Sequence, residues 1–203
     1  MTTETLTIET SAAHDGHADP TELQIFGFWL YVLSDLVLFA TLFATYAVLG
    51  RNYAGGPTPK EMFDLPYVFG ETVLLLFSSA TCGLAILAVQ AHRKDRVWIW
   101  LAITFVLGLA FVGMELREFS QLILEGHRPE RSAFLSSFFT LVGTHGAHVT
   151  AGLIWIMAMI MQVFTKGLTP AVQSRLLRFS LFWHFLDIVW VGVFTVVYLM
   201  GVM

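Results

Sequence analysis

The 203-residue sequence has few charged residues and a single cysteine. Charged residues make up 13% of the chain, against roughly 25% in a soluble globular domain, which excludes an ordinary soluble domain and a disordered chain. Because Cys82 is alone, a disulfide framework and a paired-cysteine metal or redox site are also excluded. Basic residues are scarce, with 11 Lys and Arg against 15 Asp and Glu. We therefore expect no nucleic-acid partner, which would need a basic patch.

Apolar residues are the abundant class. Hydrophobic residues make up 56% of the chain, and the mean hydropathy is +0.71. An apolar run of about 20 residues is long enough for a helix to cross a bilayer. Five such runs predict an all-α integral membrane bundle of five transmembrane helices within residues 25–203, with no room for a folded domain outside the membrane. The predicted spans are residues 25–49, 66–90, 97–124, 134–164 and 179–200.

Residues 1–24 are polar and contain no Lys or Arg. They lack the basic start and apolar stretch of a signal peptide, so we expect a disordered acidic tail. Cytoplasmic segments of membrane proteins carry an excess of Lys and Arg. Six Lys and Arg residues lie on the side of the membrane that holds the tail. The opposite side has four, or five if Arg117 is counted. This excess favours a cytoplasmic N-terminus. The six, in the second and fourth connections, are Arg93, Lys94, Arg96, Lys166, Arg175 and Arg178.

Eight acidic and histidine side chains fall inside the predicted spans, where charge is expensive. Counting from the span ends at about 1.5 Å per residue puts Asp35, His145, His184 and Asp187 near one common depth. His145 and His148 lie three residues apart on one helix face, as do His184 and Asp187. We therefore expect a polar seam between the helices. The eight candidates for buried polar, lipid-binding or structural roles are Asp35, Glu71, Glu115, Glu118, His145, His148, His184 and Asp187.

Three interpretations of this seam stay open. It could be hydrogen-bonded contact between helices, its carboxylates could serve a proton or lipid function, or its histidines could bind a haem or a metal. The last is the weakest, because a bis-histidine haem needs opposed histidines on facing helices, whereas His145 and His148 share one helix. We assign no catalytic, cofactor-binding or metal-binding residue. A row of small residues, Gly143, Ala147 and Ala151, predicts close approach of a neighbouring helix.

Five segments carry a resemblance to a known family. From Gln24 onward, nearly the whole chain resembles subunit III of the haem–copper respiratory oxidases, and the pair HGAHV and WHFLDIVW is highly specific in this order and spacing. The five spans and short polar tail favour the quinol-oxidase branch of the bo type. Cytochrome c oxidase relatives usually have seven spans and commonly a glutamate in place of Asp35. The segments are FGFWLYVLSDLVLFATLFATYAVL, LPYVFGETVLLLFSSAT, GMELREF, FFTLVGTHGAHVTAGLIW and SLFWHFLDIVWVGVFTVVYLMG.

The resemblance implies a non-redox subunit of a complex that oxidises ubiquinol, reduces O₂ to water and pumps protons in the bacterial inner (plasma) membrane during aerobic respiration. Haem b, haem o or a related haem, copper and ubiquinol are then bound in subunit I. This chain binds neither ubiquinol nor O₂, and its partners are subunits I, II and IV and phospholipid. A small proton-coupled transporter and a cytochrome c oxidase subunit III are the alternatives.

The implied roles of this chain are to stabilise subunit I, to hold lipid and to support proton uptake. By motif, Asp35 matches the buried helix-1 carboxylate of the family. Glu118, His148, His184 and Asp187 match its other recurrent polar positions.

Overall fold

The computed structural model describes residues 20–56 and 58–203, and within these ranges every regular element is helical. The predicted all-α bundle is confirmed, because five helices are long and apolar enough to cross a membrane. The fifth span is α6 continued through a π-helical segment, η2 (Phe194–Leu199), into α7 (Met200–Val202). Two short elements, α2 (Pro59–Met62) and η1 (Pro129–Arg131), lie in connections. The long helices are α1 (Pro20–Leu49), α3 (Leu65–Gln90), α4 (Lys94–Leu124), α5 (Ala133–Lys166) and α6 (Pro170–Val193).

Local sequence signals fix where the long helices begin and end. Ser132 and Thr169 cap α5 and α6, and their hydroxyls accept hydrogen bonds from the backbone N–H groups of Leu135 and Val172, at 3.1 and 3.4 Å. Gly167 ends α5 with a φ of 69°, a conformation that glycine adopts at no steric cost. The α5–α6 connection is therefore short, and the two helices are antiparallel neighbours.

The fifth span begins earlier than its apolar run. α6 starts at Pro170, whereas the run starts at Phe179. In this extension Arg175 Nη1 donates to Gln162 Oε1 of α5 at 2.7 Å. Arg175 and Arg178, which the apolar pattern assigned to a connection, are therefore helical. Residues 20–24, assigned to the polar tail, belong to α1, and residues 1–19 lie outside the described residues.

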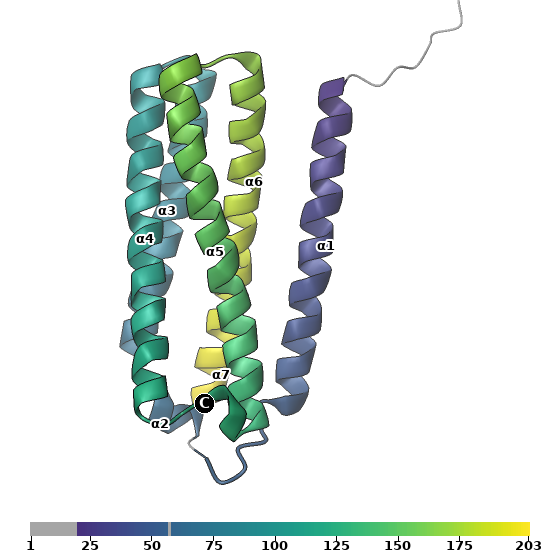
Figure 1. Cartoon of the computed structure of the whole chain (residues 1–203), viewed down its shortest axis with the longest axis vertical. Helices are drawn as coiled ribbons and strands as arrows, with labels where there is room; N and C mark the ends of the chain where they lie inside the picture. Colours follow the sequence, from purple (N-terminus) through teal and green to yellow (C-terminus); the bar gives the residue numbers. More distant parts are fainter. Residues whose placement is uncertain (1–19, 57) are drawn as a thin grey trace, which may run out of the picture.

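Four helices, α3, α4, α5 and α6, pack against one another, and α1 stands beside them in contact with α5 and α6 (Figure 1). We call the end with the start of α1 and the α3–α4 and α5–α6 connections the N-terminal end. The C-terminal end holds α2, η1 and the end of the chain. Much of the apolar surface of α1 is uncovered, which suits contact with lipid or another protein. Its exposed side chains include Phe26, Trp29, Leu30, Leu33, Val37 and Val48.

The closest helix packing surrounds Trp183 of α6. Its ring lies against Gly108 of α4 and Gly152 of α5, where an added Cβ would come within 2.9 and 2.7 Å of ring carbons. The small-residue row predicted on α5 does not have this role, because its members Ala147 and Ala151 are exposed. Gly143, the third member of the row, lies against α4, where an added Cβ would be 3.6 Å from the ring of Phe119. Around Trp183, the glycines that accommodate this bulky side chain are the ones that allow the helices to approach.

Candidate functional site: polar contacts inside the bundle

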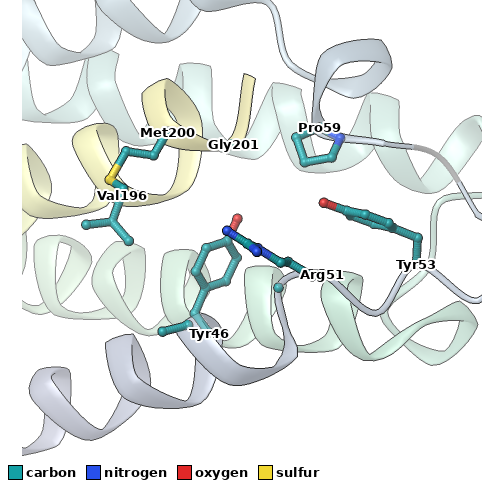
Figure 2. A pocket seen from close by; sticks show the side chains of 9 residues that line it. Tyr46, Arg51, Tyr53, Pro59, Val196, Met200 and Gly201 are labelled. Carbon is teal, nitrogen blue, oxygen red and sulfur yellow. The ribbon is translucent and has the colours of Figure 1, made fainter. Parts of the chain in front are cut away.

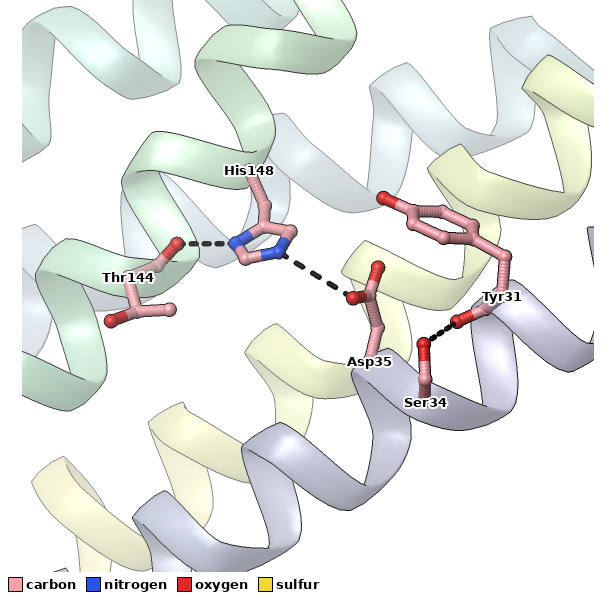
Figure 3. A network of polar contacts seen from close by, with 5 residues as sticks. All are labelled: Tyr31, Ser34, Asp35, Thr144 and His148. Carbon is pink, nitrogen blue, oxygen red and sulfur yellow. Dashed lines mark hydrogen bonds and ion pairs between the residues drawn. The ribbon is translucent and has the colours of Figure 1, made fainter.

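Asp35 of α1 and His148 of α5 face each other about midway along their helices (Figure 3). His148 Nε2 lies 3.9 Å from Asp35 Oδ1. The other ring nitrogen, Nδ1, lies 2.7 Å from the backbone carbonyl of Thr144. Because a carbonyl can only accept, Nδ1 carries a hydrogen and donates it. A single further proton, held on either His148 Nε2 or the Asp35 carboxyl, then makes the pair neutral overall at this depth in the bundle.

Substitutions of Asp35 test this pairing. We expect Asp35→Asn to lower the free energy of unfolding by less than about 1 kcal/mol, because an amide can donate to His148 Nε2 in place of the acid. Asp35→Ala removes the partner altogether and should cost about 1–3 kcal/mol. The measurement is unfolding by SDS in mixed micelles.

Ser34→Ala is the matched control for these substitutions. The Ser34 hydroxyl is exposed and donates to the backbone carbonyl of Tyr31 in its own helix, at 2.7 Å, so its loss should change little. If Asp35→Asn proved more damaging than Asp35→Ala, the pairing described here would be wrong.

A second polar contact joins α3 to α6. Ser79 Oγ and His184 Nδ1 lie 2.6 Å apart. Asp187, one turn further along α6, interacts with both side chains. This group therefore ties α6 to α3, whereas Asp35 and His148 tie α1 to α5.

His145 of α5 is completely buried between these contacts. Its Nε2 lies 3.2 Å from the backbone carbonyl of Leu186 and donates a hydrogen to it. The rings of Phe39, Phe111 and Trp190 surround the imidazole. This packing leaves no open side for a haem, and the bond to Leu186 gives His145 a structural role between α5 and α6.

Two indole groups bind α6 to α3 in a way that the sequence did not reveal. Trp183 Nε1 donates to Ser78 Oγ at 3.1 Å, and Trp190 Nε1 donates to Thr72 Oγ1 at 3.0 Å. The seven-residue spacing of the tryptophans predicted a shared packing face. Their hydroxyl partners lie 105 and 118 residues away in the sequence, so no local pattern could have identified them.

Three buried carboxyl groups lie toward the C-terminal end. Glu71 belongs to α3, and Glu115 and Glu118 belong to α4. The Tyr198 hydroxyl of η2 donates to Glu118 Oε2 at 3.0 Å. The carboxyl oxygens of Glu115 lie against Gly146 of α5, where an added Cβ would come within 2.6 Å of both. Tyr198 is a further residue that sequence analysis missed, because it lies 80 residues from Glu118.

Seven of the eight predicted residues therefore lie in separate contacts between different helix pairs, instead of one continuous seam. The eighth, Glu71, has no hydrogen-bond partner among the described residues. Over residues 20–56 and 58–203, no three His, Cys, Asp or Glu side chains are arranged to hold a metal ion. Each of the two histidines of α5 uses one ring nitrogen to bind a backbone carbonyl. These groups can form hydrogen bonds between helices and can bind protons.

Similarity to known proteins covers almost the entire chain. A family model described as cytochrome c oxidase subunit III matches residues 7–202. Cytochrome bo(3) ubiquinol oxidase subunit 3 of Pseudomonas aeruginosa is 57% identical over 188 residues, which are 93% of this chain and 90% of the relative. The protein of the same name from Pseudomonas putida is 54% identical over 185 residues, which are 91% of this chain and 89% of the relative. Quinol oxidase subunit 3 of Bacillus subtilis is 48% identical, covering 88% of each chain.

Proposed function

The chain belongs to the cytochrome c oxidase subunit III family, and from this premise we propose that it is subunit III of a cytochrome bo(3)-type ubiquinol oxidase. The observation that carries the proposal is the 57% identity, over nine-tenths of both chains, to a relative with that name. The complex oxidises ubiquinol, reduces O₂ to water and translocates protons, while this chain binds neither ubiquinol nor O₂. A cytochrome c oxidase subunit or a transporter is less favoured, because the relatives from three species are named as quinol oxidase subunits.

In this proposal the chain stabilises subunit I and shares the complex with subunits II and IV. Subunit I holds haem b, haem o and copper. Support comes from the uncovered apolar face of α1, which is suited to packing against another membrane protein. The chain lies in the bacterial inner membrane with its N-terminus in the cytoplasm, an orientation that rests on the distribution of Lys and Arg.

A lipid-binding role is part of the same proposal. At the C-terminal end, a cavity of about 420 Å³ lies between the end of α1 and the end of the fifth span. Figure 2 shows the guanidinium of Arg51 projecting into it, between Tyr46 and Tyr53. A guanidinium beside aromatic rings at a helix end is suited to the phosphate of a phospholipid headgroup. The paired Asp35 and His148, which can hold one proton between them, are the groups we assign to supporting proton uptake.

Affinity purification of this chain from its own membranes tests the proposal. We expect it to carry with it, in fixed 1:1 stoichiometry, a haem-bearing subunit and ubiquinol oxidase activity. Electrophoresis, haem spectra and oxygen consumption with ubiquinol measure the three quantities. Purification of the chain alone, or with a complex that oxidises cytochrome c instead, would contradict the proposal.

A further inference from the structure

The buried acidic cluster at the C-terminal end, formed by Glu71, Glu115 and Glu118, takes part in no ion pair among the described residues. Arg117 lines the same cavity as Glu118. Glu71 is 0% exposed, Glu115 is 3% exposed and Glu118 is 8% exposed. Both carboxyl oxygens of Glu71 and one of Glu115 are buried with no hydrogen-bond partner among the described residues. Glu71 lies close enough to interact electrostatically with the other two. Three negative charges at buried positions that interact with one another would cost far more free energy than folding can supply.

The surrounding elements do not neutralise the cluster. Neither ion pair formed by the described residues includes any of the three acids. Arg117 of α4 is exposed and lies over the ring of Tyr67 of α3, 6.0 Å from its centre. On α5, His145 is bound to a backbone carbonyl. The connection before α3 adds a further acid, Asp64, and η2 contributes the neutral hydroxyl of Tyr198.

Neutralisation by a metal ion is not supported either, because no set of three ligands occurs in the described part of the chain. The remaining ligand is the proton. A protonated carboxyl group is neutral, so burying it costs much less free energy than burying a carboxylate. The three acids together can therefore be buried when they hold protons.

Glu118 connects the cluster to water. It lines a cavity of about 220 Å³ together with Asp64, Gln121 and Glu125, which are exposed at the C-terminal end. On its other side, the hydroxyl of Tyr198 holds Glu118 Oε2. Tyr198 reaches it from η2, and π-helical segments of this kind occur frequently at functional sites.

We propose that Glu71, Glu115 and Glu118 form a buried proton-binding site that exchanges protons with the aqueous phase at the C-terminal end through Glu118. In each exchange, a hydronium ion in the cavity gives a proton to a Glu118 carboxylate oxygen and becomes water. Glu118 passes this proton on to an ionised carboxylate of Glu71 or Glu115. In the reverse direction, Glu118 takes a proton from one of these acids and gives it to water, which becomes hydronium. This site does not depend on the identity of the electron donor of the complex.

Infrared spectroscopy of the purified complex tests the site, because the C=O stretch of a protonated carboxyl group absorbs at a higher wavenumber than the amide I band. At neutral pH, Glu71→Gln and Glu115→Gln should each remove part of this absorbance. Glu130→Gln is the matched control, since Glu130 is exposed at the same end. If a glutamine variant does not assemble, Glu71→Asp or Glu115→Asp keeps the acid and should shift the band. If the carboxyl bands are the same in the wild type and in the Glu71 and Glu115 variants, the proposal is overturned.

The role of Glu118 has its own readout. In D₂O the infrared bands of the buried carboxyl groups shift to lower wavenumber as their protons exchange for deuterons. Glu118→Gln should slow this movement by about tenfold or more, corresponding to a higher barrier, while Glu130→Gln leaves it unchanged. Exchange at the wild-type rate in Glu118→Gln would show that protons reach Glu71 and Glu115 by another route, and would overturn the assignment.

Discussion

Replacement of Trp183 by alanine is expected to destabilise the bundle by about 3–5 kcal/mol, the cost of removing a large buried ring. Trp183 is 1% exposed, and its ring lies against Gly108 and Gly152 on two other helices. Within a membrane, helices associate through close packing and hydrogen bonds instead of exclusion of water. The cavity left by alanine would therefore remove contacts with α4 and α5 at once. SDS unfolding in mixed micelles measures the loss.

Two further variants separate packing from hydrogen bonding at this position. Trp183→Phe keeps much of the ring and loses the bond to Ser78 Oγ, for an expected cost of about 1–3 kcal/mol. Gly152→Ala places a methyl group 2.7 Å from the ring and should cost about 1–3 kcal/mol by overpacking. Gly83→Ala is the control, since a Cβ there meets nothing within 4 Å. Equal stability of the Gly152 and Gly83 variants would contradict this packing.

Gly146→Ala is the second substitution with a large expected effect. Its methyl group would come within 2.6 Å of both carboxyl oxygens of Glu115, so the acid must move or α4 and α5 must separate. Because Glu115 is buried, we expect its displacement to lower the free energy of unfolding by about 1–3 kcal/mol.

A double-mutant cycle tests whether Glu115 is the cause of that loss. In a Glu115→Ala background the space beside position 146 is free, so Gly146→Ala should then cost little, or even stabilise α5 through its better helix propensity. The two effects should differ by about 1 kcal/mol or more. Additive effects would mean that the Glu115 carboxyl does not lie against Gly146.

The five spans could be predicted because a helix must satisfy its own backbone hydrogen bonds in lipid, so spans appear as long apolar runs. The same rule failed at the start of α6. There the capped helix begins before the apolar run and includes polar residues such as Arg175 and Arg178. A hydropathy pattern does not detect such a polar extension. The family was also predictable, since the motifs of α5 and α6 are specific, and the match over residues 7–202 confirms it.

The polar contacts were harder to predict, because they depend on how helices rotate against each other. The spacing of His145 and His148 shows that they share a helix, but His145 binds α6 while His148 faces α1. The π-helical η2 turns Tyr198 into the interior, and no apolar pattern reveals such a change of helical register. Small residues alone did not predict the tight contacts either, which depend on where Trp183 is inserted.

We infer that this chain is a non-redox subunit which supports a respiratory oxidase through helix packing and proton binding. The haem and copper content of the purified complex, measured before and after this chain is stripped away with detergent, tests this role. We expect all haem and copper to stay with the remaining subunits and the separated chain to show no Soret absorbance. Haem or copper leaving together with this chain would contradict it.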